Sequence, residues 1–122
     1  MIVVRKHEAP TFPAPPPSRK VTKILIDPVV GSKHVAMGFT VYPAGEKGAP
    51  HVHTGEETIL ILKGKAKISS EQGEYILEAG DLVYVPPNET HTLENFGMEE
   101  LQFIWIYTPP GDEKVIRERA KK

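Results

Sequence analysis

The sequence predicts an all-β fold, and three observations carry this prediction. Short apolar runs recur along the chain, and they are rich in Val, Ile, Thr and aromatic residues. Gly, Pro, Asn and Asp separate these runs at nearly regular intervals, as turns do between strands. Helical periodicity is confined to the end of the chain. Short strands at this spacing are typical of a β-sandwich or a β-barrel.

The beginning of the chain predicts an extended arm. Residues 9–18 read APTFPAPPPS, and so many prolines exclude a helix or an inner strand and favour a polyproline-like conformation. A chain of 122 residues has room for one hydrophobic core. We therefore expect an N-terminal arm over residues 1–20, a single barrel domain over residues 21–110 and a charged tail over residues 111–122.

Eight runs in the central region are expected to form strands. In order they are VTKILI (21–26), HVAMGFTVY (34–42), EETILILK (56–63), KAKISS (65–70), EYILE (74–78), LVYV (82–85), THTLEN (90–95) and LQFIWIYT (101–108). The tail DEKVIRERAKK has helical character, because Glu113 and Arg117, like Lys114 and Glu118, are four residues apart. It predicts a helix that is too short to be stable alone.

Composition excludes several classes of function. The net charge is −1 and the lysines are scattered, so nothing favours a nucleic-acid partner. No apolar run is long enough to span a bilayer and the N-terminus lacks the layout of a signal peptide, so we expect a cytoplasmic protein without a membrane partner. The absence of cysteine excludes disulfides and sulfur-ligated metal. An excess of Glu over Asp and of Lys over Arg favours a thermophilic source.

The stretch PHVHTGEETILILKG (50–64) places polar residues at the start of an apolar strand. Residues i and i+2 of a strand point to the same face, so His51 and His53 present both rings on one side. If Glu57 faces the interior, its neighbour Glu56 points away. The two histidines of an isolated His-x-His pair are more often exposed at the surface or packed in the core than bound to a metal. The pair therefore predicts metal binding only together with further candidate ligands.

A fourth candidate ligand is His91, which begins a strand after the turn VPPNE. Three neutral imidazoles and one carboxylate make a mixed nitrogen and oxygen site, which suits transition metals better than Ca or Mg. We expect one divalent metal per chain, Mn, Fe, Ni or Zn, since the spacing does not choose among these. His7 and His34 lie outside this group and are expected to be solvated or packed.

The spacing of these residues resembles the two sequence motifs of the cupin superfamily, over about residues 34 to 108. The first motif is matched at Gly45, His51, His53, Glu57 and Gly64, and the second at Gly80, Pro86, His91 and Asn95. Asn88 stands where the family has glycine, and asparagine tolerates a positive φ, so the turn is expected to form. The resemblance implies a double-stranded β-helix (jelly-roll) barrel, with His51, His53, Glu57 and His91 as metal ligands near one mouth. We expect Gly64 and Asn95 to be structural.

Residue parity predicts the walls of a cavity above the metal. Alternate residues share one face on 34–42 and on 101–108, and two isoleucines follow the candidate carboxylate in the same parity. The expected substrate pocket comprises Met37, Phe39, Ile59, Ile61, Phe103, Trp105 and Tyr107, with Val41 on the same face as the first two. The alternative is that the aromatic residues are ordinary barrel core. Tyr107 and Gln102 are candidate polar contacts. Arg19 and Lys20 either contribute charge from the arm or, as we expect, are solvated.

A metal with four protein ligands and two open positions suits a small, oxygen-chelating substrate. The complete ligand set favours a metal-dependent enzyme, either an oxygenase or a lyase or isomerase that forms an enolate. A non-catalytic module that binds metal and a small ligand is the alternative, and a structural barrel ranks last. The resemblance also implies a C2 homodimer, in which the N-terminal arm reaches across to the partner.

Overall fold

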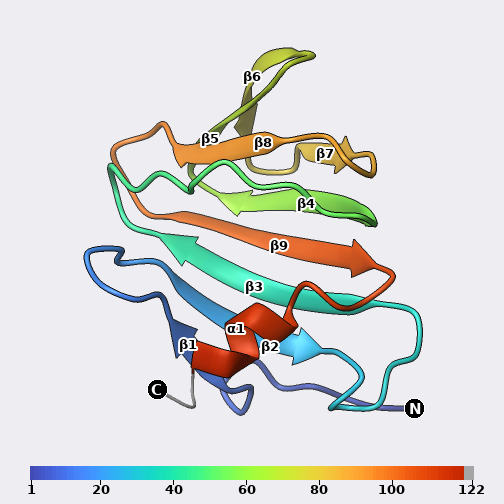
Figure 1. Ribbon diagram of the computed structural model, residues 1–122. Coiled ribbons are helices and arrows are strands. Elements are labelled where there is room, and N and C mark those ends of the chain that lie inside the picture. The colour runs from blue at the N-terminus through green and yellow to red at the C-terminus, as the bar shows by residue number, and fades with distance from the viewer. Residues whose placement is uncertain (120–122) are drawn as a thin grey trace.

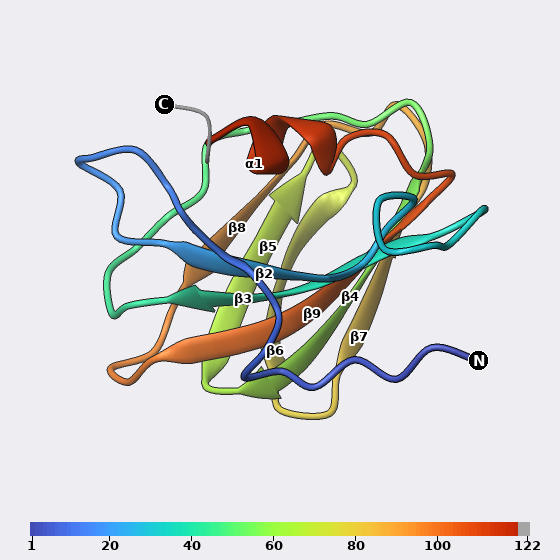
Figure 2. The same ribbon diagram turned by 90° about the horizontal axis from the view of Figure 1, so that it is seen from below.

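Two antiparallel sheets face each other in the computed structural model, which describes residues 1–119 (Figures 1 and 2). The larger sheet contains, in order, β1 (Thr11–Pro13), β2 (Val21–Ile26), β3 (Ala36–Tyr42), β9 (Leu101–Thr108), β4 (Glu56–Lys63) and β7 (Leu82–Val85). The smaller sheet contains β6 (Gly73–Glu78), β5 (Lys65–Ser70) and β8 (His91–Asn95). Together with the helix α1 (Lys114–Glu118), this arrangement confirms the predicted all-β jelly roll with a short C-terminal helix. Residues 120–122 of the predicted tail lie outside the described residues.

The hydrophobic core lies between the sheets, where alternate residues of most strands are buried. On β4, Glu57, Ile59 and Ile61 face inward, whereas Glu56 and Leu62 are exposed. The parity predicted for this strand is therefore confirmed, because a strand with one buried face alternates with a period of two. Among the residues that the structure describes, no helix is long and apolar enough to cross a bilayer.

The facing of β3 differs from the sequence-based prediction. The buried residues are Ala36, Gly38, Thr40 and Tyr42, so Met37, Phe39 and Val41 lie on the outer face of the larger sheet. The prediction that Met37 and Phe39 face the cavity is wrong. A Cβ atom on Gly38 would lie 2.1 Å from Cζ2 of Trp105. The indole of Trp105 therefore occupies the interior space that a large side chain on β3 would need.

Part of the predicted arm is an edge strand of the larger sheet. Residues 11–13 form β1, which pairs antiparallel with β2 of the same chain, and the side chain of Phe12 is buried. Further along, Arg19 donates a hydrogen bond from Nη2 to the carbonyl oxygen of Ala44. These contacts tie the arm to its own barrel, and the exchange of arms between two protomers stays a prediction.

Helix α1 lies across one end of the two sheets (Figure 2). Arg117 donates two hydrogen bonds to the carboxylate of Asp27, at 2.6 and 2.8 Å, and Asp27 is only 1% exposed. The sequence pairs Arg117 with Glu113 of its own helix, but the buried Glu113 carboxylate instead accepts a hydrogen bond from the backbone N–H of Gly111. Tertiary contacts therefore hold this helix in place, as its short length requires.

The turns of the second motif have the backbone conformation that the sequence predicts. Asn88 has a φ of 66°, in the left-handed region, and thus replaces the glycine of the family pattern. The buried side chain of Asn95 donates hydrogen bonds to the carbonyl oxygens of Tyr42 and Glu99. Asn95 is therefore structural, because it joins the end of β8 to the end of β3 and to the following loop.

Candidate metal centre and cavity

Three histidine rings surround one carboxylate oxygen inside the barrel. The Nε2 atoms of His51, His53 and His91 lie 3.7, 3.2 and 2.8 Å from Oε1 of Glu57. The four candidate ligand atoms all lie within 4.8 Å of one another. Atoms on opposite sides of one transition metal are about 4.2 Å apart at usual bond lengths, so adjustments of a few tenths of an ångström would suffice for a common cation.

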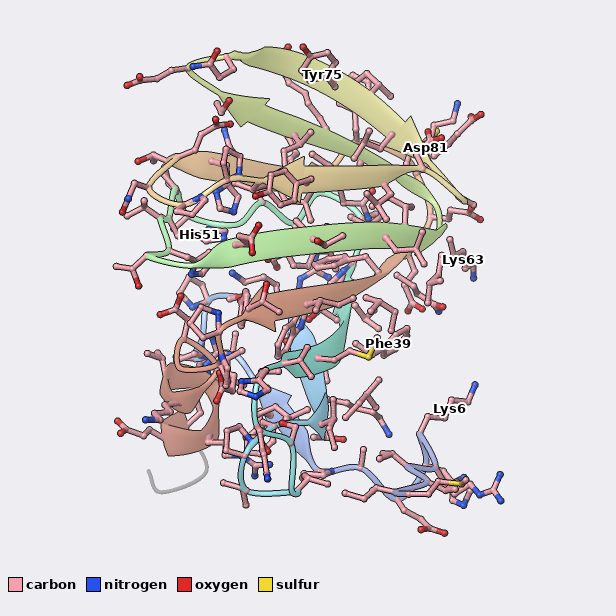
Figure 3. The ribbon with its side chains drawn as sticks, turned by 90° about the vertical axis from the view of Figure 1, so that its right-hand side faces the viewer. Lys6, Phe39, His51, Lys63, Tyr75 and Asp81 are labelled. Atoms are coloured by element: carbon pink, nitrogen blue, oxygen red, sulfur yellow. The ribbon has the colours of Figure 1, made fainter. Side chains whose placement is uncertain are left out.

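The two sheets bring these residues together from distant parts of the sequence. His51 and His53 lie on the loop that leads into β4, Glu57 is the second residue of β4, and His91 is the first residue of β8 in the other sheet. An isolated β-bridge joins His51 to His91, with backbone hydrogen bonds of 3.0 and 2.9 Å in the two directions. Figure 3 shows His51 beside the start of β4, at the end of the strand opposite Lys63.

Hydrogen bonds at the far side of two rings direct their Nε2 atoms toward the centre. Nδ1 of His51 lies 3.1 Å from the carbonyl oxygen of Ala49, and Nδ1 of His91 lies 2.9 Å from that of Glu89. A carbonyl oxygen can only accept, so Nδ1 carries the proton in both contacts. The Nε2 lone pair of the neutral ring is then free for a metal.

The third ring has a charged partner that the sequence analysis did not identify. Nδ1 of His53 lies 2.6 Å from Oδ2 of Asp112, in the loop between β9 and α1. Nε2 of the same ring is buried and has no hydrogen-bond partner among the described residues. A buried ring nitrogen without a partner is costly. The residues present therefore fit a bound divalent transition metal, to which this nitrogen would be a ligand.

The charges at the centre shift the pKa values of its groups. Burial alone would raise the pKa of Glu57, but its close contacts with the three histidines hold it well below its usual range. Burial also opposes protonation of His53 and His91, yet contact with the Glu57 carboxylate raises the pKa of both rings. Glu57 is therefore a carboxylate in every physiological condition, as a metal ligand must be.

The remaining candidates of the same residue types lie elsewhere, as the sequence predicts. His7 and His34 are exposed and are not part of the four-residue group. Glu56 points to the outer face, where its carboxylate accepts a hydrogen bond from the hydroxyl of Tyr84 at 2.5 Å. The chain thus offers Glu56 as a natural comparison for Glu57, one residue away and on the opposite face.

A cavity of about 390 Å³ opens above the four residues, which is within the range of small-molecule sites. Four of the seven predicted pocket residues line it: Ile59, Phe103, Trp105 and Tyr107. Ile61 faces inward but packs in the closed core, whereas Met37 and Phe39 lie outside the barrel. Gln102, the other predicted polar contact, is also on the outer face and does not line the cavity.

Several residues of the cavity wall were not predicted. Thr40 and Tyr42 take the places that the sequence analysis gave to Met37 and Phe39. Val115, Ile116 and Arg119 extend the wall from the C-terminal segment, together with Asp112. Lys20, which we expected to be solvated, is half-buried and also lines the cavity. These segments reach the cavity only through the tertiary fold, and no local sequence pattern identifies their residues as part of the wall.

Two aromatic rings form the wall next to the metal centre. The rings of Trp105 and Tyr107 are stacked with centroids 4.6 Å apart, and Tyr107 lies 4.7 Å from the ring of His53. Nε1 of Trp105 donates a hydrogen bond to Oγ1 of Thr40. Burial, followed by the charge of Glu57, raises the pKa of Tyr107 well above its ordinary value. Its hydroxyl is therefore a neutral donor at the edge of the cavity.

Comparisons with known proteins agree with this architecture. The cupin-domain family model matches residues 38–107. An uncharacterized protein of Methanocaldococcus jannaschii is 32% identical over 76 residues, a match that covers 62% of this chain and 61% of that protein. The chain therefore spans less than two thirds of the length of this relative.

Solved structures show the same fold at lower identity. The polyketide cyclase RemF from Streptomyces resistomycificus superposes with a TM-score of 0.78 and 19% identity, over 91% of this chain and 82% of that one. A protein of Thermotoga maritima described as a predicted oxalate decarboxylase superposes with a TM-score of 0.77 and 23% identity, over 89% of this chain and 100% of that one. The family model covers more than half of the sequence, and the chain belongs to the cupin family.

Proposed function

We propose that the protein is a metal-dependent enzyme that binds a small, oxygen-chelating molecule and forms an enolate from it, as a lyase, isomerase or cyclase does. One observation carries this proposal. Three Nε2 atoms and one carboxylate oxygen converge at the wall of a cavity large enough for a small molecule. Cupins serve many chemistries, so the proposal rests on the site and not on the fold alone.

The four polar residues would hold the metal and leave part of its coordination sphere facing the cavity. The three Nε2 atoms and the Oε1 atom lie within 4.8 Å of one another, and the cavity is lined by His51, His53 and Glu57 among others. A divalent transition metal bound there would act as a Lewis acid that lowers the pKa of a bound group and stabilises negative charge on oxygen. Mn, Fe, Ni and Zn all suit this ligand set.

The wall residues would orient the substrate and exclude water. Trp105 and Phe103 offer aromatic surface, and the Tyr107 hydroxyl offers a neutral hydrogen-bond donor beside the centre. Glu57 is a poor candidate for general base, because its lowered pKa and its three histidine contacts hold it as a carboxylate ligand. A proton would have to move to another group of the wall or to solvent.

The comparisons support small-molecule chemistry of this kind. RemF is a polyketide cyclase, and the Thermotoga maritima protein is described as a predicted oxalate decarboxylase. Cyclisation of a polyketide by carbon–carbon bond formation passes through an enolate, in which negative charge develops on the oxygen next to the reacting carbon. A Lewis acid beside an apolar, partly closed cavity stabilises such charge.

The experiment that tests the proposal measures metal content first. Protein purified without a histidine tag should contain close to one transition metal per chain by elemental analysis. The loaded protein should then catalyse exchange of the α-hydrogen of a 2-oxo or 1,3-dicarbonyl acid with solvent deuterium, without oxygen uptake. Failure to bind Mn, Fe, Ni or Zn after supplementation would overturn the proposal. Oxygen uptake would assign an oxygenase, and ligand binding without exchange would assign a binding module.

We also propose that two chains form a homodimer through the outer face of the larger sheet. The cross-strand register aligns Phe39, Ile104, Leu60 and Leu82 in one apolar row, and Leu82 is 58% exposed. Exposed apolar rows of this kind are typical of interfaces. Light scattering should give a dimer for the wild type and a monomer for Leu82→Lys. Tyr75→Lys, on the exposed β6 strand of the other sheet, is the control.

A further inference from the structure

Two cationic side chains line the cavity in addition to the residues of the candidate metal centre. Lys20 immediately precedes β2, and Arg119 immediately follows α1, so the two come from opposite ends of the chain. Neither has a role in holding the metal, and neither belongs to the two sequence motifs. Cationic side chains in the wall of a small-molecule cavity favour ligands that carry negative charge.

The strand register separates Lys20 from the metal centre. On β9, Tyr107 lies opposite Glu57, whereas Leu101, at the other end of the strand, lies opposite Tyr42. The ammonium group of Lys20 lies over the ring of Tyr42, 5.5 Å from its centroid. The cavity therefore has the metal centre toward one end of β9 and Lys20 toward the other, with Phe103 and Trp105 between them.

Within residues 1–119, neither Lys20 nor Arg119 has a side-chain hydrogen bond or an ion pair. Glu46 raises the pKa of Lys20, but its carboxylate accepts hydrogen bonds from Oγ of Ser18 and from the backbone N–H of Arg19. These contacts hold Glu46 on the arm, and it does not line the cavity.

The two acidic residues of the cavity wall are also engaged elsewhere. Glu57 contacts the three candidate histidine ligands, and Asp112 is paired with His53. With a divalent metal in place, Lys20, Arg119 and the metal together outweigh Glu57 and Asp112, so the cavity is positively charged. Both cations line the same cavity, and the positive charge of Arg119 lowers the pKa of Lys20 further after burial, although Glu46 raises it.

We propose that Lys20 and Arg119 bind an oxyanion of the ligand, so that this cavity takes a small acid with a chelating oxygen pair at one end and a second acidic group at the other. The inference rests on the proposed function, since the metal would hold the chelating end. A guanidinium group offers paired donors that match a carboxylate or a phosphate, and an ammonium group adds a point charge. Such an oxyanion would also relieve the repulsion between the two cations.

The test compares acids that differ only in the second acidic group. One pair is 2-oxoglutarate and 2-oxopentanoate, which share the chelating 2-oxo acid and the chain length. The other is 3-phosphoglycerate and glycerate, which share a chelating 2-hydroxy acid and distinguish phosphate from carboxylate. Calorimetric titration of Zn-loaded protein should give at least about tenfold tighter binding for the doubly acidic member of one pair, because each charged contact contributes that order of affinity. This measurement does not depend on turnover.

Substitutions then assign the preference to the two side chains. Lys20→Met and Arg119→Met should each reduce the preference within the pair to less than about threefold, while the singly acidic member binds as before. Lys20→Arg and Arg119→Lys keep the charge and should retain most of the preference. Arg19→Met and Lys114→Met remove neighbouring cations that do not line the cavity and should change nothing. Equal melting temperatures would show that the variants fold.

The outcomes separate this inference from the proposed function. Equal affinity within both pairs, or a preference that survives both methionine variants, overturns the inference and leaves the metal-centred function intact. Binding that is unaffected by removal of the metal overturns the proposed function. The cation pair is then tested alone on metal-free protein, where glutarate should bind more tightly than pentanoate and should lose that advantage in Lys20→Met.

Discussion

Nδ1 of His53 lies 2.6 Å from Oδ2 of Asp112, a residue 59 positions further along the chain. This contact joins the loop before β4 to the C-terminal segment that covers the cavity. The carboxylate accepts the Nδ1 proton, so it selects the tautomer of His53 that leaves Nε2 without a proton. The orientation of one candidate metal ligand thus depends on a residue outside both cupin motifs.

Asp112→Ala should therefore weaken metal binding. Carboxylate partners of ligating histidines commonly contribute ten- to a hundredfold in metal affinity, so we expect a loss of about tenfold or more. Competition with a coloured chelator measures this affinity directly. Glu118→Ala removes another exposed acidic residue of the same segment and should have no effect. An affinity unchanged in Asp112→Ala would show that the contact does not orient the ring.

The adjacent residues Glu56 and Glu57 should differ sharply in their effect on metal content. Glu57 is buried among the three histidines, whereas Glu56 is exposed on the outer face. Glu57→Gln should lower the metal content from about one per chain to a small fraction, and Glu56→Gln should leave it unchanged. Elemental analysis after extensive dialysis measures both. His51→Ala, His53→Ala and His91→Ala should behave like Glu57→Gln, and similar results for the two glutamines would contradict the assigned facing of β4.

The ion pair between Asp27 and Arg117 should stabilise the protein at neutral pH and not in acid. The hydrogen bonds from Arg117 lower the pKa of the buried Asp27, although burial itself opposes this shift. A carboxyl group whose pKa is lower in the folded protein stabilises the fold at pH values above its unfolded-state pKa, which is near 3.8. This stabilisation is lost as the pH falls through the folded-state pKa. Asp27→Asn should cost about 2 to 3 kcal/mol at pH 7, because it leaves a partly buried guanidinium without its partner.

Denaturant unfolding at about pH 7 and about pH 2.5 measures the effect of Asp27→Asn. The difference in unfolding free energy between wild type and variant should shrink at the lower pH. Glu118→Gln, on the exposed side of α1, serves as the control for a lost carboxylate. A difference that is equal at both pH values would mean that the charge of Asp27 does not stabilise the docked helix.

Gly38→Ala should destabilise the protein and disturb the cavity. The added methyl group would lie 2.1 Å from Trp105 Cζ2 and 2.7 Å from the carbonyl oxygen of Lys23, so the indole or the backbone would have to move. Overpacking of this kind commonly costs about 1 to 3 kcal/mol. Thermal unfolding measures the loss. Gly97→Ala, whose methyl group would make only ordinary contacts from 3.5 Å, should leave the melting temperature nearly unchanged.

The candidate metal centre was predictable from motif spacing together with strand alternation, which is a local property. The opposite facing of Glu56 and Glu57 follows from a period of two along β4, whereas His51 and His53 lie on the loop before this strand and were identified, like His91, by the motif spacing. The turn at Asn88 was predictable for a similar reason, since few residues tolerate a positive φ. Both features depend on the local sequence alone.

The rest of the cavity depends on packing between strands that the sequence does not pair. Alternation along β3 left open which of its two faces points into the barrel. The larger apolar side chains, Met37 and Phe39, favoured the face that in fact lies outside. The register of Gly38 opposite Trp105 decides the matter, because one large ring requires a small residue across from it. Lys20 and Asp112 reach the cavity through the docking of the two terminal segments, which leaves no periodic signal in the sequence.

The candidate ligands belong to different sheets, since Glu57 lies on β4 and His91 on β8. A cation bound between them would act as a removable cross-link across the barrel. Resistance of the protein to heat would then vary with the free concentration of that cation, and a thousandfold excess over the dissociation constant would add about 4 kcal/mol to the unfolding free energy. Protein without the cation would lose this added stability and would unfold at a lower temperature.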